Sequence, residues 1–193
     1  RSYFMARLRE ATQAEDSTGG AIFIARLANL ATVNQSLGRE ATDELLRRFG
    51  GVFGNIADDQ PDALAARLNG ADFALLVPAM ADPERTAQQL LEQLTQEAAA
   101  FLSDQASTWL GCGHFTRGID VGTVLAQVDA ALAAVEAEER NGFRIIDMRE
   151  GDDAPKSAEE WAKLIQRALE QHWVRLVSFP VASLDGRLIH REC

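Results

Sequence analysis

Two apolar segments separated by Asn69-Gly70 constrain the fold of this chain more than any other feature of its sequence. Residues 63–68 precede this dipeptide and residues 73–77 follow it, and both segments are apolar except for Arg67. Asn-Gly is preferred where both residues of a tight turn need a positive φ angle. We therefore expect two antiparallel strands joined by a tight hairpin. On this pattern alone, an ordinary structural turn is the simplest interpretation.

The remaining pattern predicts both helices and strands. Residues 21–27 form a near-continuous apolar run, which is typical of a strand buried on both faces. Arg26 lies near the end of that run, where its charged group would be expected to reach towards solvent. Periodic apolar spacing predicts the helices. We expect helices over residues 1–14, 37–56, 82–102, 123–138 and 157–171, and further strands over 107–115, 143–148, 174–181 and 187–193.

The composition argues against several classes of protein. Hydrophobic residues make up 47% of the 193 residues and charged residues 25%, as in an ordinary globular protein. The net charge of −10 argues against nucleic acid or an anionic membrane surface as a partner, because both attract basic proteins. No segment approaches the ~20 apolar residues of a membrane-spanning helix, and two cysteines fit a reducing, cytoplasmic compartment. We expect a piece of a longer protein, since the chain lacks an initiator methionine.

Cys112 and His114 are the residues that most resemble a pair of metal ligands. They lie two positions apart in an expected strand, and therefore on the same side of it. The sequence offers no third or fourth ligand near them, so we expect no metal site there.

The hairpin segment Arg67–Phe73 resembles the R-[YLF]-G-G-[DE]-E-F signature of the GGDEF family of diguanylate cyclases. The segment keeps the arginine (Arg67), the second glycine (Gly70) and the phenylalanine (Phe73) of this signature. It departs from the signature at Asn69 for the first glycine, at Ala71 for the metal-binding acid and at Asp72 for the glutamate. Weaker matches extend the resemblance over residues 1–148. It implies an α/β (α+β) fold, in which a nucleotidyl-cyclase-like, mostly antiparallel central sheet is flanked by helices.

The resemblance also implies that the chemistry of the family is lost. Diguanylate cyclases condense two GTP molecules with the help of two Mg²⁺ ions. An aspartate at the end of the first strand and the first acid of the hairpin hold these ions, and Arg26 and Ala71 stand at those positions. Mg²⁺ requires oxygen ligands, and Asp72 would offer a single carboxylate. We therefore expect no catalytic residue, no bound metal, no cofactor and no cyclase activity.

Two positions that contact the nucleotide in the family survive in this chain. Asn34 matches a residue that contacts the nucleoside, and Asp43 matches one that reads guanine. Arg26 could replace the metal as a counter-charge for phosphate. Glu136, however, stands where the family has a lysine that meets the triphosphate. Weak GTP binding is therefore left open as an alternative.

Residues 157–193 resemble the opening of an EAL phosphodiesterase domain, including the first helix and strands of its barrel. Glu192 falls on the metal-binding glutamate of that family, whereas Phe179 replaces a glutamine that contacts the cyclic dinucleotide. The expected organisation is a degenerate GGDEF domain over residues 1–148, a linker over 149–156 and a truncated EAL domain over 157–193.

These resemblances imply a role in bacterial cyclic-di-GMP signalling. We expect an inactive regulatory and interaction module from a tandem GGDEF–EAL receptor that controls biofilm or adhesion, of the LapD-like class, with a parent protein anchored in the inner membrane. Its expected partners are its own EAL domain and, through that domain, cyclic-di-GMP, while a homodimer is left open. The alternative is that the domain regulates an active EAL phosphodiesterase, which Glu192 favours. An unrelated α/β domain would fit the apolar pattern but not these motifs.

Overall fold

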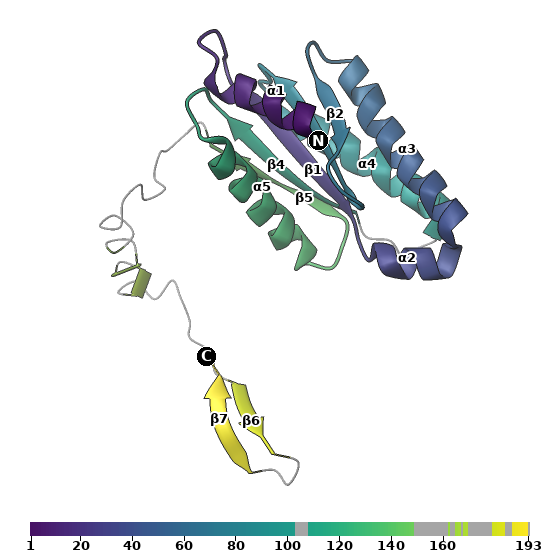
Figure 1. The fold of residues 1–193 in the computed structure, drawn as a ribbon, viewed down its shortest axis with the longest axis vertical. Coiled ribbons are helices and arrows are strands. Elements are labelled where there is room, and N and C mark those ends of the chain that lie inside the picture. The colour runs from purple at the N-terminus through teal and green to yellow at the C-terminus, as the bar shows by residue number, and fades with distance from the viewer. Residues whose placement is uncertain are drawn as a thin grey trace. The chain divides into compact units, whose positions relative to one another are not determined.

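The structure is a computed structural model that describes residues 1–102, 108–148, 162, 165–166, 168–169, 179–183 and 187–192. The chain divides into two compact units, Arg1–Glu150 and Gly151–Cys193. The first unit is a five-stranded sheet with helices on both faces (Figure 1). Its elements are α1 (Ser2–Gln13), β1 (Gly20–Leu27), α2 (Leu30–Leu37), α3 (Arg39–Asp58), β2 (Leu64–Arg67), β3 (Asp72–Pro78), α4 (Pro83–Leu102), β4 (Thr108–Phe115), α5 (Val121–Glu136) and β5 (Gly142–Asp147).

The strands of the first unit are arranged in the order β2-β3-β1-β4-β5. The apolar run predicted as a buried strand is the central one, β1, which pairs antiparallel with both β3 and β4. β2 pairs antiparallel with β3, and only the β4–β5 pair is parallel. The predicted fold class, a mostly antiparallel sheet flanked by helices, is therefore confirmed.

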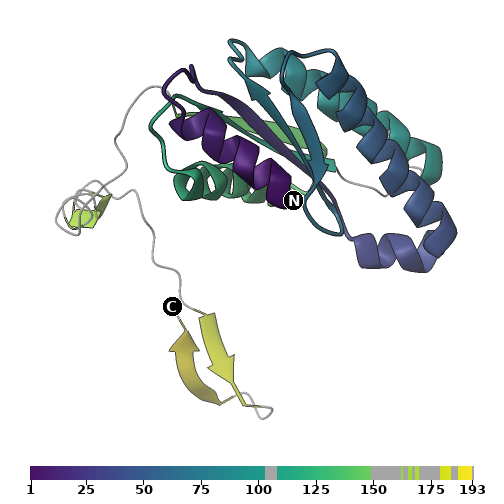
Figure 2. The same ribbon diagram turned by 45° about the horizontal axis from the view of Figure 1, so that its top comes forward.

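Alternation along β1 divides the core into two layers. Phe23 and Ala25 belong to a cluster that includes the inner faces of α3 and α4, whereas Ile22 and Ile24 belong to one that includes α1 and α5. Figures 1 and 2 show the same division, with α1 and α5 on one face of the sheet and α3 and α4 on the other. Because both layers are apolar, β1 carries almost no polar side chain until it reaches Arg26.

A glycine on β4 sets the position of α5. A Cβ atom at Gly111 would lie 2.6 Å from the carbonyl oxygen of Val128 and 3.0 Å from the backbone nitrogen of Leu132, both in α5. The absence of a side chain therefore lets the helix backbone pack directly on the strand. This close packing brings the C-terminal end of α5, and with it Glu136, towards the end of β1.

The predicted helix over residues 37–56 begins later than expected, and a separate helix precedes it. Gly38 has a φ angle of 78°, which places it outside helical geometry between α2 and α3. Asn29, just before α2, is also left-handed with a φ angle of 50°. The helix α2 is too short for a clear periodic pattern, which is why the sequence did not reveal it.

The second unit is described in part. Its strands β6 (Phe179–Ala182) and β7 (Leu188–Glu192) pair antiparallel, with Phe179 opposite Glu192. Within the predicted helix over 157–171, the described residues 162, 165–166 and 168–169 are helical. The expected linker over 149–156 and residues 174–178 of the expected strand lie outside the described residues. Among the helices that the structure describes, none is long and apolar enough to span a membrane.

Candidate functional site

The hairpin between β2 and β3 is present, but its turn differs from the one predicted. Arg67 pairs with Phe73, and the four residues 68–71 form the loop between strands. Neither Asn69 nor Gly70 has a positive φ angle, so the expected two-residue turn is wrong. The side chain of Asn69 provides the reason, because its Oδ1 accepts hydrogen bonds from the backbone N–H groups of Ala71 (3.1 Å) and Asp72 (3.0 Å). Asparagine here turns the chain through its amide rather than through a left-handed backbone.

Arg67, the last residue of β2, also stabilises this loop. Its Nε donates to the carbonyl oxygen of Asn69 (3.1 Å) and its Nη2 to that of Gly70 (2.6 Å). The guanidinium carbon lies 5.5 Å from the ring centroid of Phe73, within range of a cation–π contact. The retained Arg67 and Phe73 therefore hold the loop in one conformation.

Arg26 makes a bidentate ion pair with Asp72 across the sheet. The two residues are partners in the antiparallel β1–β3 register. Nε of Arg26 donates to Oδ1 of Asp72 (2.8 Å), and Nη2 donates to Oδ2 (3.0 Å). Asn69 adds a third hydrogen bond, from its Nδ2 to Asp72 Oδ2 (2.8 Å). Asp72 is thus enclosed by donors, and its side chain is only 10% exposed.

A second acid meets Arg26 from α5. Oε2 of Glu136 lies 3.5 Å from Nη1 of Arg26, and the side chain of Glu136 is 43% exposed. Asp129, which lies seven residues before Glu136 on α5, also acts electrostatically on Arg26. One guanidinium is therefore surrounded by carboxylates from β3 and α5, while 34% of the Arg26 side chain stays exposed.

The pKa values reflect this arrangement. The hydrogen bond with Asp72 raises the pKa of Arg26, partial burial opposes this effect, and the charges of Asp72, Glu136 and Asp129 add to it. Burial raises the pKa of Asp72, but the hydrogen bonds from Arg26 and Asn69 and the charge of Arg26 together hold it below its ordinary value. Both groups are therefore charged at neutral pH.

This arrangement of strands, helices and hairpin has a match among protein families. The family model described as "Diguanylate cyclase, GGDEF domain" matches residues 1–142 of the chain. The chain belongs to the GGDEF family. The matched residues contain every strand of the first unit up to the start of β5, and they include Arg26, Asp72 and Glu136.

Two proteins are related to this chain in sequence, and the matches cover different shares of their lengths. A Streptomyces griseus protein, named "Uncharacterized protein in hutH 5'region", is 30% identical over 172 residues, which cover 82% of this chain and 69% of that protein. The RNase E specificity factor CsrD of Escherichia coli K12 is 24% identical over 186 residues, which cover 93% of this chain but 28% of CsrD.

Solved structures share the fold at lower identity. LapD of Vibrio cholerae, in an S helix-GGDEF-EAL structure bound to c-di-GMP, has a TM-score of 0.65 at 21% identity and is matched over 99% of this chain and 45% of that one. The GGDEF domain of DgcB from Caulobacter crescentus, in complex with c-di-GMP, has a TM-score of 0.63 at 23% identity and is matched over 76% of this chain and 89% of that one. The chain thus spans less than half of the LapD structure.

The residues of this GGDEF domain do not fit the two Mg²⁺ ions that cyclase chemistry in the family implies. A guanidinium occupies the end of β1, and it has donors but no acceptor for a metal. Ala71 has no ligand atom in its side chain. Both carboxylate oxygens of Asp72 already accept hydrogen bonds from Arg26 and Asn69. A divalent ion at Asp72 would have to share this carboxylate with the Arg26 guanidinium, whose positive charge repels it.

The predicted nucleotide residues lie on α2 and α3, the two helices that follow β1. Asn34 is exposed on α2, where its backbone oxygen accepts from the backbone N–H of Gly38. Asp43 is exposed on α3. Among the described residues, neither is hydrogen bonded to Arg26, which is held by Asp72 and Glu136 instead. Binding of a nucleotide by Asn34 and Asp43 therefore stays a prediction.

The sequence identified the departures at positions 26, 72 and 136 but not their mutual contact. One signal could have revealed it. Relative to the family, an acid has become Arg26 and a cation has become Glu136, so two charges have reversed sign together. Paired reversals of this kind indicate that the two side chains meet.

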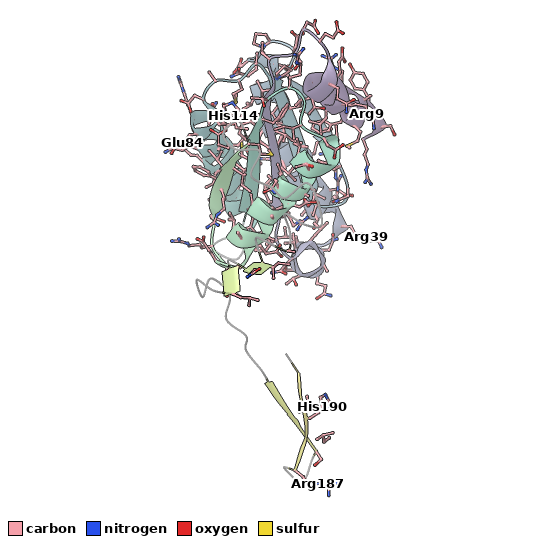
Figure 3. All side chains as sticks on the ribbon, turned by 90° about the vertical axis from the view of Figure 1, so that its left-hand side faces the viewer. Arg9, Arg39, Glu84, His114, Arg187 and His190 are labelled. Carbon is pink, nitrogen blue, oxygen red and sulfur yellow. The ribbon has the colours of Figure 1, made fainter. Side chains whose placement is uncertain are left out.

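Cys112 and His114 have structural roles. Both are buried in β4, and burial raises the pKa of the Cys112 thiol. Nε2 of His114 lies 2.7 Å from the carbonyl oxygen of Met80. Figure 3 shows His114 towards the same end of the first unit as Glu84, which lies in the first turn of α4. No group of three or more His, Cys, Asp or Glu residues is positioned to hold a metal in the described part of the chain.

A pocket lies at the end of the sheet away from Arg26. Its lining includes Gln60, Pro78, Asp82 and Arg85. Pro78 pairs with the first residue of β1, whereas Arg26 lies at the opposite end of that strand. The pocket is therefore separate from the ion-paired cluster.

Proposed function

We propose that this GGDEF domain is catalytically inactive and acts as a regulatory module in bacterial cyclic-di-GMP signalling. The observation that carries the proposal is the bidentate ion pair between Arg26 and Asp72. It fills the space at the end of β1 where the family resemblance calls for a metal-binding carboxylate. A guanidinium stays charged at any physiological pH, so it cannot become a metal ligand there.

Electrostatics also oppose the binding of a triphosphate. Arg26 is already neutralised by Asp72, and Glu136 and Asp129 add further negative charge beside it. A triphosphate entering this region without metal would meet a net negative cluster. We therefore infer that GTP does not bind productively, although Asn34 and Asp43 are retained on α2 and α3.

The comparisons support the signalling context. Structures of LapD and DgcB that share this fold were solved with c-di-GMP bound. CsrD, a sequence relative, is named as an RNase E specificity factor and not as a nucleotide-synthesising enzyme. The diguanylate cyclase SiaD of Pseudomonas aeruginosa, which shares this fold over 57% of its chain, was solved in complex with its activator SiaC.

The organisation of the parent protein belongs to the same proposal. We infer that residues 1–148 are the GGDEF domain, that 149–156 are a linker and that 157–193 begin an EAL domain. The match to the S helix-GGDEF-EAL structure of LapD over 99% of this chain supports this reading. The proposed partners are the protein's own EAL domain and, through it, cyclic-di-GMP. The parent would be a receptor for biofilm or adhesion control, anchored in the inner membrane.

One observation favours a second candidate, in which the domain regulates an active EAL phosphodiesterase. Glu192, the residue that matches the metal-binding glutamate of EAL domains, is present in β7 opposite Phe179. Phe179 replaces the dinucleotide-contacting glutamine and favours the receptor instead. In either case the GGDEF domain regulates and does not catalyse.

The first test is a synthesis assay on the 193-residue chain. The chain would be incubated with GTP and either Mg²⁺ or Mn²⁺, beside an active diguanylate cyclase, and cyclic-di-GMP would be quantified by chromatography. We expect no product above the protein-free blank. Formation of cyclic-di-GMP by this chain would overturn the proposal.

The second test separates the two candidate parents. The full parent protein would be titrated with cyclic-di-GMP by calorimetry, and the same sample would then be assayed for hydrolysis. Tight binding without turnover is expected for the receptor, and turnover would identify the regulated phosphodiesterase. Removal of residues 1–148 should change the affinity or the rate; if neither changes, the regulatory role is wrong.

A further inference from the structure

Arg26 has the surroundings of a bound cation. Its guanidinium is reached by the carboxylate of Asp72 from β3 and by that of Glu136 from α5. Asp129 contributes a further negative charge. These acids come from separate segments of the chain and meet at one positive charge.

The Asp72 carboxylate is held in place by its own loop, independently of Arg26. Asn69 donates to Oδ2 of Asp72 and accepts from the backbone N–H of the same residue. The backbone oxygen of Asp72 also accepts from the N–H of Leu68 (2.9 Å). Removal of Arg26 would therefore leave Asp72 pointing at the same place, with Glu136 on the facing helix.

The ion pairs of Arg48, on another part of the domain, serve as a comparison because they are exposed at the surface. It also contacts two carboxylates, those of Glu44 (3.2 Å) and Glu97 (3.4 Å). All three side chains are exposed by about a third or more, at 48%, 39% and 32%. Neither acid is buried in the way that Asp72 is, and exposed ion pairs of this kind contribute little to stability.

Resting on the proposed inactivity of the domain, we infer that Arg26 is a resident cation that replaces a divalent metal ion and closes a latent cation site formed by Asp72 and Glu136. The native protein then needs no metal to hold its signature hairpin against β1. Removing the guanidinium leaves the acids uncompensated around a vacant position, where a divalent or trivalent cation can bind through carboxylate oxygens. The hairpin conformation is therefore permanent and does not depend on Mg²⁺.

The neighbouring indole offers a direct probe. Trp109 is the cross-strand partner of Arg26 on the β4 side and is buried. A Tb³⁺ ion bound at the vacated position would lie close enough to this indole for sensitised luminescence. The chain has three tryptophans, so Trp109→Phe in the variant background shows which indole is responsible.

The experiment measures Tb³⁺ luminescence during titration of the wild-type chain, Arg26→Ala, Arg26→Gln, Arg26→Lys and Arg48→Ala. We expect no saturable signal for the wild type, Arg26→Lys or Arg48→Ala. Arg26→Ala and Arg26→Gln should bind Tb³⁺ at least about tenfold more tightly than the wild type, because a positive charge beside the ion is gone. Adding Asp72→Asn, Glu136→Gln or Trp109→Phe to Arg26→Ala should remove the signal.

Two results would overturn the inference. One is a saturable wild-type signal that Asp72→Asn abolishes, since the site would then be open despite Arg26. The other is the absence of binding in both neutral variants. Thermal unfolding of the wild type gives a second reading that does not require any variant to fold. A saturable rise of the midpoint with Mg²⁺, above that seen with Na⁺ at equal ionic strength, contradicts the inference.

These outcomes are distinguishable from failure of the proposed function. Cyclic-di-GMP synthesis would contradict the proposed inactivity. A metal-binding wild type that makes no product would contradict only the role of Arg26.

Discussion

Two arginines of this domain each contact two carboxylates, yet they differ in what surrounds them. Arg26 lies at the end of the central strand and pairs with an aspartate whose side chain is 10% exposed. Arg48 lies on α3, and its partners Glu44 and Glu97 are 39% and 32% exposed. Arg48 also lies 5.2 Å from the ring centroid of Phe101, so its contacts are spread over the helix surface.

The comparison shows that the number of ion pairs is a poor guide to their importance. The Arg26–Asp72 pair is bidentate, fixed by strand register and supported by Asn69. The strand register and Asn69 fix the position of the Asp72 carboxylate, so less side-chain entropy is lost when the ion pair forms. The contacts of Arg48 join long, exposed side chains, and water can solvate these charges about as well as the ion pairs do. The burial of Asp72 and its support by the loop backbone therefore distinguish the Arg26–Asp72 pair from the exposed pairs of Arg48.

The largest effect is expected for Asp72→Ala. This change leaves Arg26 partly buried without its main partner. We expect a loss of about 2–3 kcal/mol in the free energy of unfolding, less than the ~3–5 kcal/mol of a fully buried pair because Arg26 is partly exposed. Urea unfolding followed by circular dichroism measures it. Asp43→Ala, an exposed change on α3, is the matched control and should stay within about 0.5 kcal/mol.

A loss below about 1 kcal/mol for Asp72→Ala would remove the distinction between the two arginines. The Arg26 cluster would then be an ordinary surface feature.

Acidification should remove the same contribution without a mutation. Because the pKa of Asp72 is lower in the folded than in the unfolded chain, its stabilisation is fully present above the unfolded value, about 3.9. It is lost as the pH falls through the lower, folded pKa. The stability difference between the wild type and Asp72→Asn should therefore be constant from pH 7 to about pH 5 and shrink below about pH 4. A difference that grows on acidification contradicts the sign of this shift.

Asn69→Ala tests the support of the pair by the loop. The change removes one hydrogen bond to Asp72 Oδ2 and two backbone hydrogen bonds in the loop. We expect a loss of about 1–2 kcal/mol, because the exposed loop lets water replace part of these bonds. Chemical denaturation is the measurement, and Asn55→Ala, an exposed change on α3, is the control. Equal stability of Asn69→Ala and wild type would show that Arg26 alone orders Asp72.

The smallest effect is expected for Arg48→Ala. Its loss should cost less than about 1 kcal/mol and should shrink further in 1 M NaCl, because exposed ion pairs are screened. The same salt should leave most of the Asp72→Ala effect intact. Thermal unfolding of both variants at low and high salt compares them, and equal salt sensitivity would contradict the difference in burial.

The sequence predicted much of the first unit because its apolar pattern is strong. The central position of β1 follows from a run that is apolar on both faces, and the inner residues Leu45, Phe49 and Phe53 of α3 follow from helical periodicity. The short helix α2 and the turn at Asn69 were missed. A side-chain hydrogen bond decided the turn, and dipeptide preferences do not record it.

The ion-paired cluster could not be predicted from local sequence patterns, for a different reason. Arg26, Asp72 and Glu136 are separated by 46 and 110 positions along the chain. Their contact depends on the β1–β3 register and on the close packing of α5 against Gly111. The resemblance gave each position its family role, but only the fold brought the reversed charges together.

The most direct test of the central claim is calorimetric titration of the 193-residue chain with GTP, with and without Mg²⁺. A domain closed by Arg26 should give no saturable heat in either condition. Saturable, Mg²⁺-dependent binding that weakens in Asn34→Ala and Asp43→Ala would contradict the claim, because it would show that metal and nucleotide enter the site despite the ion pair.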